Sequence, residues 1–167
     1  MSAIPVVAFA AYSGTGKTTL IEKLVVELKR IGLRVAVIKH DAHDFEIDHE
    51  GKDSWRFAQA GADMTIISSA SKTAIIEQRE RTLEQNISMV HDVDLILVEG
   101  YKHGSLPQIG IYRTATGQGL PAEIDRYIAV VTDDHDTDAS VPHFGLEDIT
   151  GLTAFVMDSM GIIFPGS

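Results

Sequence analysis

Apolar and polar residues follow one another along the chain in blocks that predict alternating strands and helices. A continuous apolar run over residues 4–11 is typical of a strand that is buried on both faces. Over residues 18–31, apolar side chains recur every three or four positions, as on one face of a helix, and Gly32 follows as a stop signal. A second apolar run over residues 33–40 completes a strand–helix–strand unit, which predicts a parallel sheet with a right-handed crossover.

The rest of the chain continues this alternation. Two short helices are expected, one over residues 54–61 with Ser54 as its cap and one over residues 83–90. A closing helix is expected over residues 146–160, with Gly151 weakening its middle. Further strands are expected over residues 64–69, 72–78, 93–100, 108–113 and 127–133.

Composition and charge narrow the class of protein. At 167 residues, with 44% apolar and 23% charged side chains, the chain has the length and balance of one folded domain. The formal net charge of −10 would repel a nucleic-acid backbone or an anionic membrane, so neither is expected as a partner. Cysteine is absent, which excludes disulfides and thiolate metal ligands. We find no pattern of a secretory signal or a membrane span, so the cytoplasm is the expected location.

One short stretch, AAYSGTGKTTL over residues 10–20, lies between the first predicted strand and the first predicted helix. Gly16, Lys17 and Thr18 match the end of the phosphate-loop pattern Gly-x4-Gly-Lys-Ser/Thr, while Ala11 stands in place of its first glycine. In such a loop, backbone N–H groups and the helix N-terminus surround an anion. The sequence therefore predicts a nucleotide site.

Each residue of this loop has an expected role. Lys17 is expected to contact the β- and γ-phosphates, Thr18 to offer its hydroxyl to Mg²⁺, and Thr19 to reach the α-phosphate. Glu99 ends the apolar strand in the middle of the chain, and we expect it to join the magnesium shell or to orient a water. The backbone N–H groups of residues 13–18 are expected to surround the phosphates, and these residues include Ser13, Gly14, Thr15 and Gly16.

The pattern and the loop together predict the fold class. We expect an α/β, P-loop NTPase-like fold, with a mainly parallel sheet flanked by helices and an antiparallel strand or hairpin added to it. One nucleotide-binding domain is expected over residues 1–167, with residues 162–167 as a flexible tail.

A polar, acidic stretch follows the second predicted strand, at the same sheet edge as the phosphate loop. Lys39 or Lys52 could reach a phosphate, and Asp41 could contact magnesium or act on a nucleophilic water. Three histidines with carboxylates between them could instead form a metal site; these are His40, His43 and His49.

Two further features of a nucleotide site are residues that recognise the base and an arginine beside the phosphates. Asp133 or Asp134, at the end of a late strand, could accept the N1–H and 2-amino hydrogens of guanine, although the Asn-Lys-x-Asp sequence of many GTPases is absent. The sequence places no arginine beside the phosphates. Arg56, Arg79 or Arg113 would act there only if a loop or a second subunit brought it in.

The chain resembles the MobB family of molybdopterin-guanine dinucleotide biosynthesis adapter proteins in four segments, AYSGTGKTTL, VIKHDAHDFEID, GKDSWRFAQAGA and DLILVEGYKH. The resemblance covers most of residues 5–133 and implies a GTP-binding protein, usually a homodimer, that is at most a weak GTPase forming GDP and phosphate. It also implies assistance to the enzyme that joins GMP to molybdopterin, and contact with molybdoenzymes or their chaperones.

The resemblance also implies roles for individual residues. The segment Gly14–Thr19 would hold the phosphates and Mg²⁺. Lys39, His40 and Asp41, together with Glu99, would line the same cleft.

Three other functions stay open at this point. A small-molecule kinase would use the same loop to transfer the γ-phosphoryl group to an acceptor near Asp41. A metal-delivery GTPase would carry its cargo on the histidines of residues 40–49. A pure adapter would use its nucleotide as a structural or regulatory ligand and would act through protein contacts.

Overall fold

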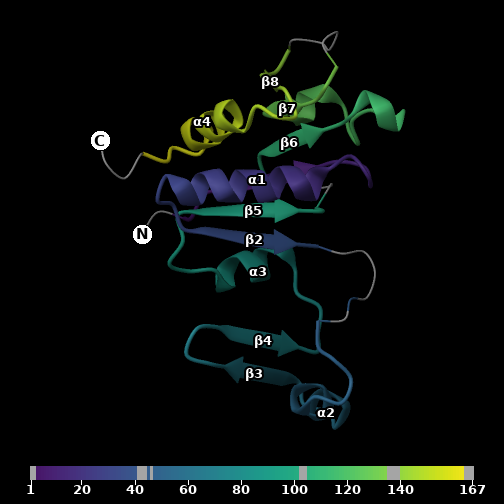
Figure 1. Cartoon of the computed structure of the whole chain (residues 1–167), viewed down its shortest axis with the longest axis vertical. Helices are drawn as coiled ribbons and strands as arrows, with labels where there is room; N and C mark the ends of the chain where they lie inside the picture. The colour runs from purple at the N-terminus through teal and green to yellow at the C-terminus, as the bar shows by residue number, and fades with distance from the viewer. Residues whose placement is uncertain (1–2, 41–44, 46, 102–104, 135–139, 164–167) are drawn as a thin grey trace. The chain divides into compact units, whose positions relative to one another are not determined.

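The chain is described here by a computed structural model that covers residues 3–40, 45, 47–101, 105–134 and 140–163 (Figure 1). It divides into two compact units. We call Met1–His40 with Ile87–Ser167 the sheet unit, and Asp41–Asn86 the hairpin unit. Because a compact unit need not be an independent domain, the single domain over residues 1–167 stays a prediction.

The sheet unit is built on six parallel strands in the order β2-β5-β1-β6-β7-β8. In this register Glu99 is level with both Phe9 and Lys39, so the carboxyl ends of three strands meet at one edge. Ligands of open parallel sheets gather at this edge. The strand bounds are β1 Val6–Ala10, β2 Val35–Lys39, β5 Leu95–Glu99, β6 Gln108–Ile111, β7 Ala129–Val131 and β8 His143–Phe144.

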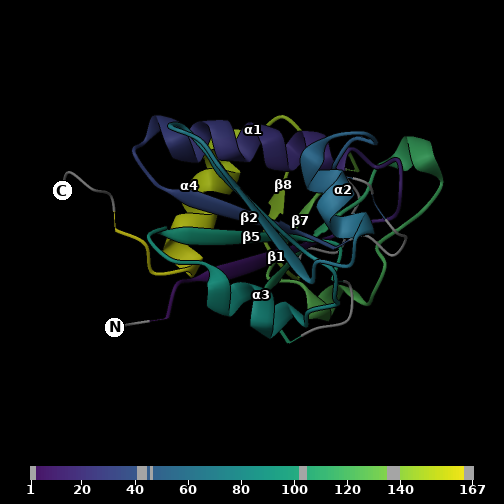
Figure 2. The same cartoon turned by 90° about the horizontal axis from the view of Figure 1, so that it is seen from below.

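Helices α1 (Lys17–Arg30) and α4 (Ile149–Ser159) lie against one another and cover one face of this sheet (Figure 2). Side chains that point from alternate strand positions to this face share one core with the buried stripes of both helices. The opposite face has a smaller cluster around Tyr112, Tyr127 and Val130. The main core includes Val7, Phe9, Leu24, Leu28, Leu97, Ile109, Leu152 and Val156.

The hairpin unit contains helix α2 (Asp53–Gln59) and the antiparallel strands β3 (Met64–Ser68) and β4 (Thr73–Glu77). None of the side chains of these three elements is buried. Helix α3 (Leu83–Met89) runs across the boundary between the units. A mainly parallel sheet flanked by helices, with an added antiparallel hairpin, confirms the predicted fold class.

Some details of the elements differ from the prediction. Helix α2 begins at Asp53, so Ser54 lies inside the helix and does not cap it; the extended residue before the helix is Lys52. The short strand β8 and the 3-10 helices η1 (Thr114–Thr116) and η2 (Ile124–Arg126) are not predicted, because two or three residues carry no periodicity.

Gly151 lies in the first turn of α4 and not in its middle. The Oδ1 atom of Asp148 accepts a hydrogen bond of 3.0 Å from the Gly151 N–H and so caps the helix. A Cβ atom on Gly151 would lie 2.5 Å from the Asp148 carboxylate, so the glycine leaves room for the cap.

The end of the chain is described as far as Ile163. The backbone N–H of Ile162 donates to the Met157 carbonyl at 2.8 Å, and the Ile162 side chain packs against the main core, whereas Ile163 is exposed. The rest of the predicted tail, residues 164–167, lies outside the described residues. Among the helices of the described chain, none combines the length and the apolar character that crossing a bilayer requires.

Candidate functional site

The loop between β1 and α1 turns twice through the left-handed region, at Gly14 (φ +81°) and at Gly16 (φ +91°). Gly16 is the cap residue of α1 and brings no side chain to the helix end, so the N–H groups of the first turn are left for solvent or a ligand. Ala11 has no positive φ, since Asp92 is the only described non-glycine residue that does. An alanine is therefore sufficient where the phosphate-loop pattern has its first glycine.

A buried threonine fixes the shape of the loop. The hydroxyl of Thr15 donates a 3.0 Å hydrogen bond to the Tyr12 carbonyl, and Thr15 is only 1% exposed. Around it, Ser13, Thr18 and Thr19 are exposed at the surface, where a ligand can reach them. The buried hydrogen bond of Thr15 thus stabilises the loop, while the outer face of the loop stays accessible to a ligand.

Glu99 lies between two residues that begin α1. The Thr18 hydroxyl donates a 3.2 Å hydrogen bond to Glu99 Oε1, and Lys17 Nζ lies 3.6 Å from the same oxygen. The side chains of Lys17 and Glu99 are 16% and 10% exposed, so this ion pair is largely removed from water. The hydroxyl and the carboxylate are hard oxygen donors of the kind that Mg²⁺ takes.

The adjoining ends of β2 and β5 are packed too closely for a side chain at Gly100. The His40 N–H donates to the Glu99 carbonyl at 2.8 Å, and the rings of His40 and Tyr101 lie 4.5 Å apart between centroids. Gly100 has a φ of +105°, and a Cβ atom there would lie 2.5 Å from the His40 carbonyl oxygen. His40 therefore supports the backbone that carries Glu99, while Lys39, level with Glu99, is exposed.

Gly100 and Tyr101 also support this end of β5, although the sequence alone assigns neither of them a role in the site. A glycine immediately after a strand-end carboxylate is the signal that could have shown a tight backbone turn there.

The two aspartates after β7 hold the neighbouring loop. Asp133 accepts a 2.8 Å hydrogen bond from the backbone N–H of Thr114, which lowers the pKa of the Asp133 carboxyl, with a smaller contribution from the charge of Arg113. Asp134 accepts a 3.0 Å hydrogen bond from the Tyr112 hydroxyl. Recognition of guanine by Asp133 stays a prediction, and guanine would compete with Thr114 for the carboxylate.

Other predicted residues belong to the hairpin unit or lie outside the described residues. Asp41 and His43 lie outside the described residues. Lys52 and His49 belong to the hairpin unit, as do Arg56 and Arg79, which pair with Asp53 and Glu77. Over the part of the chain that is described, no three histidine or carboxylate side chains are grouped to hold a metal ion.

The parallel sheet, the Gly-Lys-Thr loop that leads into α1 and the acidic residue at the end of the neighbouring strand define the class: the sheet unit has a P-loop NTPase-like fold. The family model for Molybdopterin guanine dinucleotide synthesis protein B, MobB, matches residues 6–133. The chain belongs to the MobB family, as its sequence resemblance predicts.

Relatives and solved structures agree with this assignment. The Molybdopterin-guanine dinucleotide biosynthesis adapter protein of Escherichia coli K12 is 38% identical over an alignment of 165 residues that covers 94% of each chain. The adapter protein of the same name from Haemophilus influenzae is 40% identical over 132 residues, covering 77% of this chain and 74% of that one. A crystal structure of Bacillus subtilis MobB matches with a TM-score of 0.77 at 26% identity, over 94% of this chain and 98% of that one.

Replacement of Gly100 by alanine is expected to lower the free energy of unfolding by about 2 kcal/mol or more, because the new Cβ atom meets both a left-handed backbone and the His40 carbonyl. Urea denaturation followed by circular dichroism measures the loss. Gly117→Ala is the matched control: Gly117 also has a positive φ, +65°, but a Cβ atom there meets nothing within 4 Å. Equal losses in the two variants would contradict the close approach of His40 and Gly100.

Proposed function

We propose that this chain is a GTP-binding adapter protein that assists molybdopterin guanine dinucleotide biosynthesis and hydrolyses GTP weakly at most. The observation that carries the nucleotide site is the arrangement of Lys17 and Thr18 on one oxygen of Glu99, beside the uncapped N-terminus of α1. The adapter role is supported by membership of the MobB family, whose relatives in Escherichia coli and Haemophilus influenzae are named adapter proteins.

An arriving phosphate chain would change the partner of Lys17. The ammonium group now lies beside the Glu99 carboxylate, and a triphosphate at the loop would offer it a denser negative charge. Glu99 and Thr18 would then share Mg²⁺, which neutralises phosphate charge when it is bound. Thr15 and its hydrogen bond to Tyr12 would keep the loop in shape during this exchange.

The proposal also includes a preference for guanine, particular partner proteins and a location in the cell. Asp133 lies two residues after β7, the second strand from β1 in the sheet, and is the proposed reader of the base. The enzyme that attaches GMP to molybdopterin, and molybdoenzymes or their chaperones, are the proposed protein partners. The cytoplasm stays the predicted location.

Lys17→Ala is expected to weaken Mg²⁺-dependent binding of GTP by about 100-fold or more, since the variant loses the only charged group that the loop itself supplies. Titration of fluorescent GTP and ATP analogues measures the affinities. Lys23→Ala, which removes a lysine of the same helix that pairs with the exposed Glu147, should bind like the parent.

Two outcomes would contradict the proposal in different ways. Tight GTP binding retained by Lys17→Ala would contradict the phosphate-loop assignment. Tighter binding of ATP than of GTP by the parent would contradict a GTP-binding adapter and point to the small-molecule kinase.

Glu99→Gln is expected to raise the Mg²⁺ concentration needed for half-maximal GTP binding by about tenfold, because the amide keeps the contact with Thr18 but offers no carboxylate to the ion. Nucleotide titrations at a series of Mg²⁺ concentrations measure this shift. Glu147→Gln removes a carboxylate that pairs with Lys23 at the surface and serves as the control. An unchanged Mg²⁺ requirement in Glu99→Gln would leave Glu99 as a structural partner of Lys17 only.

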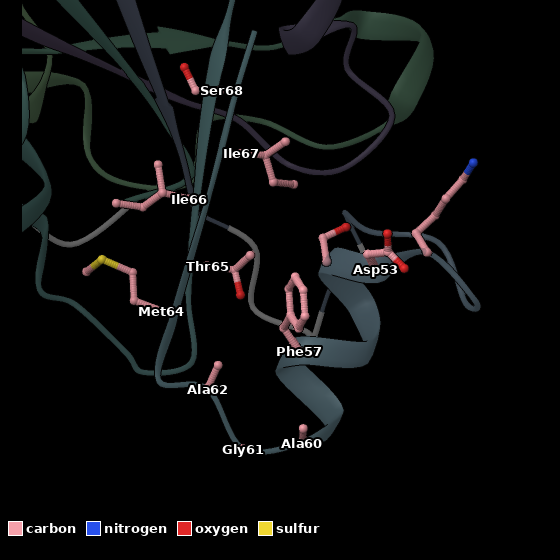
Figure 3. A pocket seen from close by; sticks show the side chains of 12 residues that line it. Asp53, Phe57, Ala60, Gly61, Ala62, Met64, Thr65, Ile66, Ile67 and Ser68 are labelled. Atoms are coloured by element: carbon pink, nitrogen blue, oxygen red, sulfur yellow. The ribbon is translucent and has the colours of Figure 1, made fainter.

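We also propose that the chain is a homodimer in which hairpin units of two copies meet. Apolar side chains lie on both faces of the hairpin: Figure 3 shows Phe57 and Ile67 between α2 and β3, with Met64 and Ile66 directed to the other side. Ile66 is 61% exposed and Ile75, opposite it on β4, is 52% exposed. A two-stranded hairpin with so little burial is marginally stable, and a second copy would cover it.

Ile66→Glu is expected to weaken dimerisation by about tenfold or more, because it introduces a charge where the second copy would bury apolar surface. Sedimentation velocity over a range of protein concentrations measures the effect. Val26→Glu is the control, since Val26 is a similarly exposed apolar residue, 69% exposed, on α1 of the sheet unit. A monomeric parent, or an Ile66→Glu variant that dimerises like Val26→Glu, would contradict the proposed dimer.

A further inference from the structure

One arginine of the sheet unit lies against the phosphate loop. Arg113 comes two residues after the end of β6, and β6 is the neighbour of β1 in the sheet. Its guanidinium group lies over Gly16: a Cβ atom on Gly16 would be 3.3 Å from the Nη2 atom and 3.5 Å from Cζ and Nε of Arg113. The absence of a side chain at Gly16 therefore gives the guanidinium its place beside the start of α1.

The charge of Arg113 has no close partner within the described chain. Its Nε–H group is buried and donates no hydrogen bond to a described residue, and the Arg113 guanidinium forms no ion pair with a described carboxylate. The two acidic groups whose pKa values its charge helps to lower are Asp133 and Glu147. Each is engaged more strongly by another residue, Asp133 by the Thr114 N–H and Glu147 by Lys23.

Several features around Arg113 favour the binding of an anion. The N-terminus of α1 carries the positive end of the helix dipole, and Lys17, the first residue of that helix, is a second cation. The buried Nε–H group of Arg113, which has no acceptor among the described residues, adds a desolvation cost. A phosphate bound at the loop would bring negative charge to the helix N-terminus, to Lys17 and to Arg113. Its oxygens would also accept hydrogen bonds from the backbone N–H groups and from the guanidinium.

We propose that Arg113 is a phosphate ligand of this site, supplied by the same subunit from the connection after β6. It binds the phosphate chain of the nucleotide from the side of Gly16, while Lys17 approaches from the side of Glu99. The inference rests on the proposed function, because the phosphate it binds belongs to the proposed nucleotide. Neither a second subunit nor a loop of the hairpin unit is needed to bring an arginine to the phosphates.

The test compares Arg113→Gln and Arg113→Lys with the parent, and Arg126→Gln is the control for loss of an exposed arginine of the sheet unit. GTP and inorganic tripolyphosphate are titrated into each protein in the presence of Mg²⁺. Arg113→Gln should bind both ligands about tenfold or more weakly than the parent, since a charged hydrogen bond to phosphate is lost. Arg113→Lys should fall between them, because lysine keeps the charge but not the planar pair of donors, and Arg126→Gln should match the parent.

Tripolyphosphate separates contact with phosphate from contact with the base or ribose. A loss for GTP without a loss for tripolyphosphate would overturn the proposal, and so would parent-like binding of both ligands by Arg113→Gln. If Arg113→Gln binds both ligands like the parent while Lys17→Ala binds GTP only weakly, the proposed function stands and only the role of Arg113 is contradicted. If the parent itself binds neither GTP nor tripolyphosphate, the proposed function and the role of Arg113 are both contradicted. Should Arg113→Gln not fold, Arg113→Lys decides: weaker binding of both ligands supports the proposal and unchanged binding overturns it.

Discussion

The contact of Glu99 with the start of α1 is the interaction on which the site depends. Glu99 and Thr18 are 81 positions apart in the sequence, and they meet because β1 and β5 are parallel neighbours in register. A carboxylate so little exposed needs compensation, which the Lys17 ammonium and the Thr18 hydroxyl provide. The same contact fixes where α1 begins relative to the sheet edge, and so where the N–H groups at its N-terminus lie.

The surroundings hold this contact from two sides. On the β2 side, the His40 N–H bonds to the Glu99 carbonyl, and Gly100 turns through a backbone conformation that leaves no room for a side chain. On the β6 side, Gly16 leaves the space that Arg113 occupies. Two glycines thus serve opposite purposes: one lets backbone approach backbone, and the other lets a cation approach the helix N-terminus.

The two units of the chain differ in how they are stabilised, and this difference suits an adapter. The sheet unit has its own core on both faces of a six-stranded sheet, as a rigid support for a ligand site requires. The hairpin unit buries none of the side chains of α2, β3 and β4 and presents apolar residues instead. In the proposed function, the first unit binds the nucleotide and the second contributes surface for association with a second copy.

The sequence by itself determined the elements and the loop, because both depend on near neighbours along the chain. Apolar periodicity located the main strands and helices, and the spacing of Gly16, Lys17 and Thr18 located the loop. Only the tertiary structure decided which distant residues meet: that His40 packs against the residues that follow Glu99, that Asp133 holds Thr114, and that Arg113 lies over Gly16. Strand order and register set these contacts, and long-range pairing leaves no local signal in a single sequence.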